Sequence, residues 1–195
     1  MSRVKNLLSN SVVGPLILGV ALITGPSVAT AAADEVAEAP AERTASDFIG
    51  SYRYVGGESE QERAYAAVDE IVDNLNFMIR GMARRALRKP TTPPKSANIQ
   101  ITGDVITIAG GVGKAPVSIT INGPAVDYKG DDGKTYKMSM RFRGGKLVQK
   151  IVGHNSTTIK TYRLSEDGAR LKIKTKISHP MMHKPLEYKF TYRRS

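Results

Sequence analysis

The chain of 195 residues contains no cysteine. This absence excludes disulfide bonds, thiolate catalysis, metal sites built on thiolates and a lipid attached to an N-terminal cysteine. Acidic residues are also scarce, with 18 Asp and Glu against 29 Lys and Arg, so the formal net charge is +11. A basic surface favours an anionic neighbour such as a membrane, a polyanion or nucleic acid, and net charge alone does not choose among them.

Arrangements of residues that would form a catalytic or metal centre are missing as well. The acids cluster in turns and near the ends of expected elements, and no Ser/His/Asp set stands out, so we expect no enzyme. Of the three histidines, His179 and His183 lie four residues apart in a proline-containing loop, and His154 would have to join them from another turn. Because no carboxylate or fourth ligand is placed beside them, we expect neither a metal site nor a cofactor.

The apolar run near the N-terminus is too short to span a bilayer. Residues 12–23 form this run of about a dozen residues, whereas a spanning helix needs about 20. Arg3 and Lys5 precede it, and Ala-x-Ala follows at 29–31 and again at 31–33. This order predicts a secretory signal peptide over residues 1–33, with an uncleaved anchor as the alternative. The mature protein would then be periplasmic or secreted with a charge of +11 − 2 = +9, and a location outside the cytoplasm disfavours nucleic acid as a partner.

Two further segments follow the expected signal. Residues 34–46 are rich in Ala, Glu and Pro and show no periodicity, which predicts a flexible leader. Residues 47–195 are regular in pattern and long enough to bury a core, which predicts one domain.

Alternation of apolar and polar side chains dominates that domain. The apolar partners in one strand are Tyr136, Met138, Met140 and Phe142, and Lys137, Ser139, Arg141 and Arg143 alternate with them. A period of two predicts a strand with one buried and one solvated face. Turn signals separate runs of this kind. The expected strands cover residues 47–55, 98–102, 105–109, 117–121, 125–129, 136–143, 146–152, 157–164, 170–178 and 186–194. Such a meander closes into an antiparallel up-and-down barrel to remove its edges.

One long helical insert interrupts the strands. Apolar residues recur every three or four positions across residues 58–89, which predicts an amphipathic helix between strands one and two. Ser59 with Glu62 resembles a capping box at its start. Asn74 and Asn76 are points where one helix could become two, and Pro90 ends the pattern. We expect this insert to cover one opening of the barrel as a lid, with contact to a bilayer or partner as the alternative.

These segments together resemble the intracellular fatty-acid-binding and retinoid-binding proteins of the calycin group. That family has ten-stranded barrels in which a helical lid lies between strands one and two, so the resemblance implies a mainly β fold of this kind. It covers roughly residues 48–194, although the family lacks an export signal and has a shorter lid. The matching segments are residues 48–55, 89–91, 99, 103–108, 144–150, 157–159, 167–168 and a closing strand that ends at Tyr192.

The resemblance also implies a hydrophobic small molecule, fatty-acid-like or lipid-like, inside the barrel. The family holds a ligand carboxylate with an arginine on the eighth strand and an Arg-x-Tyr pair on the last. Tyr192 matches the tyrosine, but Phe190 stands where the arginine is expected. On the eighth strand the polar end of the ligand could be held by Tyr162, Arg163 or Lys160, depending on which way the strand faces. The ligand-binding set that we expect is Tyr52, Tyr54, Tyr136, Met138, Met140, Phe142, Tyr162, Arg163, Tyr188, Phe190 and Tyr192.

The outward residues of the meander suggest a second function. Their basic members are Arg141, Arg143, Lys150, Lys172, Lys174, Lys176, Lys189 and Arg193. Each cation near an anionic bilayer contributes about 1 kcal/mol, so such a face could dock on a membrane surface. Interleaved aromatics are missing from it, so we expect no nucleic-acid partner. The alternative function is therefore a filled barrel that binds an envelope surface or a protein, because bulky inward side chains can fill a small barrel without a ligand. In either case we expect a monomer.

Overall fold

The alternating segments form the strands of a single sheet. The computed structural model describes residues 43–110, 116–130 and 132–195. The predicted signal peptide and the predicted leader up to residue 42 lie outside the described residues. The elements are a 3-10 helix (Ala45–Phe48), β1 (Gly50–Tyr54), α1 (Gly57–Asp73), α2 (Phe77–Arg88), β2 (Ser96–Thr102), β3 (Val105–Gly110), β4 (Val117–Thr120), β5 (Val126–Lys129), β6 (Thr135–Arg143), β7 (Lys146–Val152), β8 (Thr157–Leu164), β9 (Arg170–Ser178) and β10 (Leu186–Arg194).

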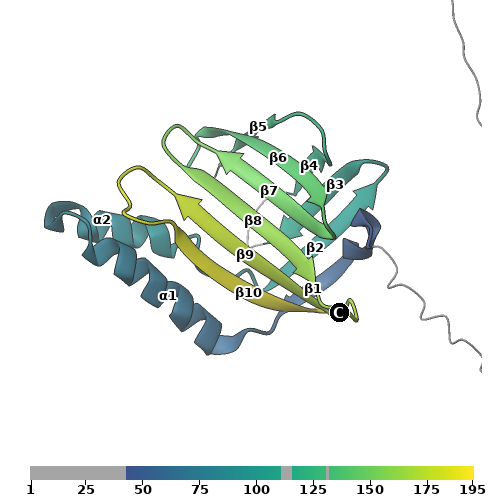
Figure 1. Cartoon of the computed structure of the whole chain (residues 1–195), viewed down its shortest axis with the longest axis horizontal. Helices are drawn as coiled ribbons and strands as arrows, with labels where there is room; N and C mark the ends of the chain where they lie inside the picture. The colour runs from purple at the N-terminus through teal and green to yellow at the C-terminus, as the bar shows by residue number, and fades with distance from the viewer. Residues whose placement is uncertain (1–42, 111–115, 131) are drawn as a thin grey trace, which may run out of the picture. The chain divides into compact units, whose positions relative to one another are not determined.

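The sheet curls into a nearly closed barrel (Figure 1). Its strand order is β4-β3-β2-β1-β10-β9-β8-β7-β6-β5, so strands pair antiparallel with their sequence neighbours except β4 and β5, which form the two ends of the sheet, and β1 pairs with β10. Closure occurs where the chain after β4 meets β6. Ile121 bridges Met140, and the Asn122 N–H donates to the Met140 carbonyl at 2.8 Å. Asn122 has φ +60°, a conformation that Asn tolerates, and its side chain accepts a bond from the Phe142 N–H at 3.1 Å. The ten-stranded antiparallel barrel predicted from the sequence is confirmed.

The first predicted strand begins later than expected. The sequence predicts a strand from residue 47, but the chain makes a 3-10 turn over Ala45–Phe48 before β1 starts at Gly50. Phe48 is fully buried and its ring lies edge-on to Phe142, with centroids 6.4 Å apart. Because Phe48 precedes β1 and the helices follow it, Phe48 closes the barrel at the end opposite the helices. We call these the closed end and the helix end.

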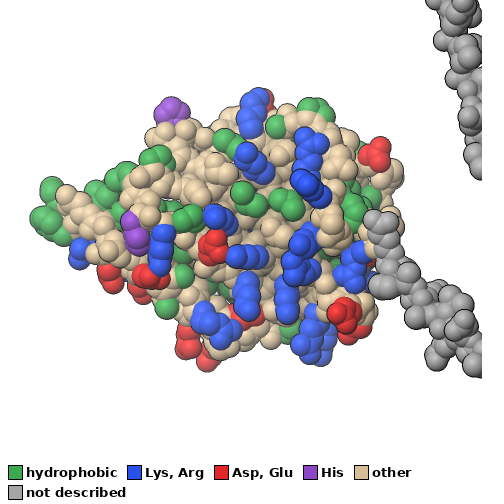
Figure 2. All heavy atoms as spheres, in the orientation of Figure 1, with side chains coloured by type: hydrophobic (Ala, Val, Ile, Leu, Met, Phe, Trp, Pro, Cys, Tyr) green, Lys and Arg blue, Asp and Glu red, His purple; other side chains and the backbone are tan. Residues whose placement is uncertain are grey.

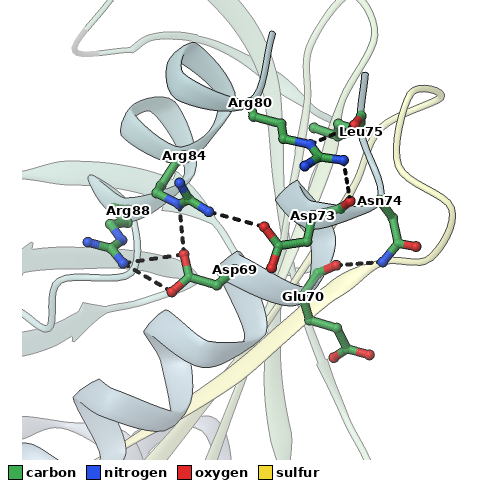
Figure 3. Close-up of polar contacts among 8 residues, drawn as sticks. All are labelled: Asp69, Glu70, Asp73, Asn74, Leu75, Arg80, Arg84 and Arg88. Atoms are coloured by element: carbon green, nitrogen blue, oxygen red, sulfur yellow. Dashed lines mark hydrogen bonds and ion pairs between the residues drawn. The ribbon is translucent and has the colours of Figure 1, made fainter. Parts of the chain in front are cut away.

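The helical insert consists of two helices that fold back on each other (Figure 3). The break falls at the predicted weak point, where the Asn76 side chain accepts the Met78 N–H at 3.0 Å and caps α2. Arginines of α2 then reach back to acids of α1: Arg84 Nε lies 2.9 Å from Asp69, and Arg88 contacts the same carboxylate at 3.1 Å. These pairs are partly exposed, so each contributes little alone. The polar side of α2 nevertheless faces α1 as a result.

Ser59 does not cap α1, contrary to the predicted capping box. The helix begins at Gly57, whose φ is +64°, and Ser59 lies within its first turn. Glu60 instead fixes this end: its carboxylate, only 8% exposed, accepts the Thr191 N–H at 2.8 Å and the Thr191 hydroxyl at 2.7 Å. The Glu60 side chain thereby lies beside β10 at Thr191, just past the point where the pairing of β1 with β10 ends. A Cβ on Gly56 would lie 1.8 Å from the Glu60 carboxylate, so glycine is required there.

Aromatic side chains of β10 and β1 form much of the core. Tyr54 stands edge-on to both Phe190 and Tyr192, with centroids 5.7 and 5.6 Å apart, and Tyr188 lies 5.3 Å from Phe190. The Tyr188 hydroxyl donates to the Pro90 carbonyl at 2.8 Å, which ties the end of the helical insert to the barrel. Burial raises the pKa of Tyr188 to about 12. This hydroxyl therefore stays protonated well above neutral pH.

Substituting Glu60 should destabilise the whole domain. Glu60→Ala leaves the Thr191 N–H and hydroxyl without their acceptor, which should lower the free energy of unfolding by about 2–3 kcal/mol. Gly56→Ala should do the same indirectly because it displaces the Glu60 carboxylate. Equilibrium denaturation in urea measures both. Glu62→Gln, an exposed neighbour on α1, is the control and should change stability by less than about 0.5 kcal/mol. Equal effects of Glu60→Ala and Glu62→Gln would contradict this role.

The raised pKa of Tyr188 predicts a loss of stability at alkaline pH. An unfolded tyrosine ionises near 10.0, whereas the folded one keeps its proton until about pH 12, so the stabilisation from protonated Tyr188 is complete below pH 10 and is lost as pH rises toward 12. The loss amounts to about 1.4 kcal/mol per pH unit for this one group. Tyr188→Phe should be less stable than the wild type by about 1 kcal/mol at neutral pH. Denaturation series should show the two proteins converge, then cross, between pH 10 and pH 12; a constant gap would contradict the assignment.

Candidate functional site: the barrel interior

Cross-strand rows of side chains line the inside of the barrel. Residues in register on neighbouring antiparallel strands share a face, so each row crosses several strands. Near the closed end one row runs from Leu147 through Tyr162 and Ile173 to Phe190. The next row toward the helix end runs across β6–β10, and its members are Met140, Gln149, Lys160, Thr175 and Tyr188. This second row, which we call the polar row, carries the chemistry of the interior.

Lys160 places a cation on the inner wall. It stands in register between Gln149 and Thr175, which are 7% and 3% exposed and point inward. Among the described inward positions of the strands, Lys160 is the charged one in the middle of the wall; the other, Arg194, lies at the closed end of β10 against Tyr52. It is half-buried, on a wall whose other side chains are mostly apolar. An amine in such a place can bind a carboxylate, phosphate or sulfate group, with Gln149 and Thr175 as polar neighbours.

A hydrogen-bond relay joins Lys160's neighbours to the closed end. The Tyr162 hydroxyl donates to the Gln149 carbonyl oxygen at 3.0 Å, and the Gln149 amide donates to Met138 Sδ at 3.0 Å. Burial raises the pKa of Tyr162 well above its ordinary value, and burial is also the largest cause of the raised pKa of Tyr192. Both hydroxyls are therefore neutral donors at physiological pH. Neutral donors hold an anion without adding negative charge.

Arg163 does not belong to the interior, which corrects the expectation from sequence. Strand β8 alternates so that Tyr162 and Leu164 are buried while Arg163 is exposed on the outer wall. Because side chains of a strand alternate between faces, Lys160 and Tyr162 lie inside and Arg163 outside. Of the three candidates that the sequence left open on the eighth strand, the structure brings two to the inner wall.

Besides Tyr188, whose hydroxyl contacts Pro90, three further predicted tyrosines use their hydroxyls to hold the structure. The Tyr52 hydroxyl donates to the Phe48 carbonyl at 2.8 Å and accepts from Arg194 at 2.9 Å. The Tyr54 hydroxyl donates to the Gly57 carbonyl at 2.8 Å, where β1 turns into α1. The Tyr136 hydroxyl donates to Asp132 at 2.7 Å in a turn at the helix end. Their rings contribute to the wall, but their polar ends are committed elsewhere.

The remaining predicted residues lie on the inner wall. They are Met138, Met140, Phe142, Tyr188, Phe190 and Tyr192, and all but half-buried Phe142 are at most 8% exposed. The structure thus gathers the predicted set, apart from Arg163, around one interior. Whether these side chains bind a ligand stays a prediction.

The interior is sealed at one end and partly accessible at the other. Leu147, Tyr162 and Leu171, near the closed end, are at most 3% exposed. Inward residues nearer the helix end, including Thr158 and Lys160, keep partial contact with solvent. The two hollows that stand out among the described residues lie outside the interior: one of about 250 Å³ beside Tyr136, His154 and His179, and one of about 360 Å³ at the closed end. Methionines on the inner wall are the side chains that can shift most readily around a ligand.

The histidines do not form a metal centre in the described part of the chain. His154 and His179 border the same hollow, but His183 is not part of its lining. Within the described residues, no group of three His, Cys, Asp or Glu side chains could hold a metal ion. None of the described helices has the length and apolar character needed to cross a bilayer.

Sequence reasoning missed Gln149 and Thr175. Both are polar residues at inward positions of strands β7 and β9, where the alternation predicts apolar side chains. The available signal was their register: once Lys160 is placed inward, its partners on both sides are Gln149 and Thr175. That register depends on turn lengths that the sequence alone leaves uncertain.

The known proteins that this chain resembles were found among solved structures. No protein-family model matches the chain, and no curated protein matches it. Lipid binding protein 8 of Caenorhabditis elegans, in its apo form, is 17% identical with a TM-score of 0.52, and the match covers 80% of this chain and 100% of that one. Zebrafish ileal bile acid-binding protein, complexed with cholic acid, is 18% identical with a TM-score of 0.52, over 77% of this chain and 100% of that one.

A third similar structure extends the range of sources. An abundant heat soluble protein from Ramazzottius varieornatus is 16% identical with a TM-score of 0.51, and the match covers 79% of this chain and 99% of that one. At such low identities the likeness concerns the backbone alone. The chain therefore has the fold of the fatty-acid-binding-protein-like barrels of the calycin group, as the sequence predicts.

Proposed function

We propose that this protein is an exported, non-enzymatic barrel that binds a hydrophobic small molecule with an anionic head group in its interior. The observation that carries the proposal is Lys160, an amine on the inner wall between Gln149 and Thr175. A carboxylate inside a barrel is costly unless a cation and hydrogen-bond donors compensate it. Lys160 would supply the cation, whose position on the eighth strand the sequence left open, and the Tyr192 hydroxyl would supply a hydrogen-bond donor.

The ligand's apolar part would lie among the aromatic and methionine side chains of the wall. Ligand sites of this type combine a mostly apolar lining with a few placed polar groups. The inner wall has the same composition, because the polar row lies among apolar side chains. Similar structures include a protein named for lipid binding and one complexed with cholic acid. Those names support the class of ligand, a fatty-acid-like or bile-acid-like amphiphile. Export rests on the expected signal peptide, and periplasm and full secretion are both consistent with it.

Ligand recovery from the native source is the direct test. Native mass spectrometry of the protein purified from its own cell envelope should show a bound mass of a few hundred daltons that disappears after delipidation. Absence of such a mass, together with no uptake of fatty-acid or bile-acid probes, would sink the proposal.

Lys160→Met should weaken binding of charged amphiphiles selectively. Loss of one charge-assisted contact costs about 1.5–3 kcal/mol, so affinity for a fatty acid should fall about ten- to a hundredfold. Affinity for the matching fatty alcohol should stay the same because it has no charge to compensate. Titration calorimetry measures both. Lys150→Met, which removes the same charge from the outer face of β7, is the control and should bind like the wild type. Parallel losses for acid and alcohol would show that Lys160 only supports the fold.

The helix α2 suggests how the ligand would enter. Its arginines face α1, so the apolar side chains Phe77, Met78 and Met82 are turned to solvent and are 77%, 78% and 74% exposed. None of the residues of α2 is buried. A basic helix with exposed apolar side chains is suited to lie at a bilayer surface. We assign α2 the role of a lid that contacts an anionic membrane while a ligand passes between the bilayer and the barrel.

Phe77→Gln combined with Met82→Gln should slow ligand transfer without changing equilibrium affinity. Transfer of a fluorescent fatty acid from anionic vesicles should slow about tenfold, because the variant gains less from burying apolar surface at the bilayer. Stopped-flow fluorescence measures the rate. Val105→Thr with Val126→Thr, at exposed sites on β3 and β5, should leave it unchanged. A transfer rate that does not depend on vesicle concentration would exclude direct contact.

A second candidate function remains, because the side chains of the inner wall are bulky and almost fully buried. Bulky side chains such as Phe190 and Tyr192 can fill a small barrel unaided. In that case the basic outer wall would be the functional surface, and the protein would bind an anionic component of the cell envelope. The wild type would then take up no amphiphile at all.

A further inference from the structure

Four cations stand side by side on the outer wall near the closed end. Arg143 pairs with Lys146 across β6 and β7, and Arg163 pairs with Lys172 across β8 and β9. Lys146 and Arg163 lie one step beyond the last β7–β8 pair, Leu147 with Tyr162, and they line the same hollow. We call these four residues the cation ladder. Neighbouring strands are about 4.8 Å apart, so the ladder presents one cation per strand along a nearly straight line.

No ion pair with a described acid relieves the repulsion within the ladder, although Glu166 borders the same hollow as Lys146 and Arg163. Like charges directly opposite each other on neighbouring strands are destabilising. Elsewhere on this wall, Glu187 compensates Lys174 at 2.6 Å and Lys176 at 3.3 Å. No described acid forms an ion pair with a member of the ladder. Figure 2 shows Lys and Arg side chains gathered over the wall formed by β7–β10, with few acids among them. A row that costs stability and stays uncompensated is suited to an external anion.

A hollow of about 360 Å³ extends the ladder at the closed end. Its lining includes three cations, Arg43, Lys146 and Arg163, and one acid, Glu166. Arg43 is held in place because its guanidinium donates to the carbonyls of Ser165 at 2.9 Å and Glu166 at 3.3 Å. The hollow is shallow and open to solvent, large enough for one sugar ring or a similar polar group. Cations thus outnumber acids three to one around a depression that continues the line of the ladder.

We infer that the cation ladder and its hollow bind a linear acidic polysaccharide that carries carboxylate or sulfate groups. One ring of such a chain advances it by about one strand-to-strand step, so its anions recur at spacings comparable with those of the cations in the ladder. Acidic residues on one face of an extended peptide are about 6.8 Å apart and fall out of register. Exposed aromatics that would stack nucleic acid bases are absent from the described ladder and hollow. A flat bilayer would touch the convex outer wall along a narrow line, so it would contact only part of the ladder.

This inference deepens the second candidate function and does not require a ligand in the interior. Outside the cell, the ladder would hold the protein on an anionic envelope polymer. The variant Lys160→Met should therefore bind the polysaccharide like the wild type. If amphiphile binding fails but the ladder binds polysaccharide, the interior proposal alone is wrong, and the reverse result separates them equally well.

The test compares Arg143→Gln combined with Arg163→Gln against a control with the same charge change. The control, Lys95→Gln with Lys129→Gln, removes two exposed cations that lie away from the ladder. Calorimetry with polygalacturonate and with heparin oligosaccharides should show about thirtyfold weaker binding for the ladder variant and less than about threefold for the control. The slope of log affinity against log salt should fall by about two for the ladder variant. Urea denaturation should show the ladder variant at least as stable as the wild type, since repulsion is relieved.

Other outcomes overturn the inference. Equal weakening in both variants would mean that net charge alone drives binding. Ladder-dependent binding to vesicles of anionic lipid, without binding to either polysaccharide, would assign the surface to a bilayer. Equal affinity for double-stranded DNA and for the polysaccharides would show an unselective polyanion surface. No binding of the wild type to either polysaccharide at low salt would exclude the site.

Discussion

The junction between the helices and the barrel depends on one buried carboxylate. Strand β1 pairs with only the last part of β10, from Tyr192 to Arg194, so the N–H of Thr191, just before this part, needs another partner. Glu60 supplies it by accepting both the N–H and the hydroxyl of Thr191. Because Glu60 lies in the first turn of α1, the same contact sets where α1 begins. The position of the lid therefore follows from how the sheet ends its pairing, and Gly56 leaves the space in which this happens.

Strand parity assigns the two functional surfaces. On β8, Lys160 and Tyr162 face inward, whereas Arg163 faces outward and joins the cation ladder. Arg163, one position after Tyr162, thus belongs to a different surface, for which we propose a different class of anion. To bind an amphiphile, the interior would use the single charge of Lys160 against one ligand head group. To bind a polyanion, the outer wall would use several neighbouring cations. One strand can serve both because its faces are separated by the wall itself.

The sequence predicts the strands well because their alternation is strong and their turns are marked by glycine. It also locates the helix break, since Asn76 is a good cap and a poor residue within a helix. It does not place Phe48 in a 3-10 turn, because that conformation depends on packing against Phe142, which is distant in sequence. Nor could it find the polar row, since Gln149 and Thr175 become neighbours of Lys160 only through strand register. The local sequence pattern predicts the helices and strands, whereas the register between strands determines which side chains form a site.

The attachment of α2 has a consequence for local unfolding. None of its residues is fully buried: Ala83 and Leu87 pack partly buried against the core, and Arg84 and Arg88 form ion pairs with α1 that solvent reaches. Salt screens such pairs, whereas the barrel depends on buried apolar contacts that salt does not weaken. Amide protons of α2 should thus exchange through local opening at a free energy far below that of global unfolding, and rising ionic strength should widen the difference. The lid and the barrel are in this sense separate cooperative units within one domain.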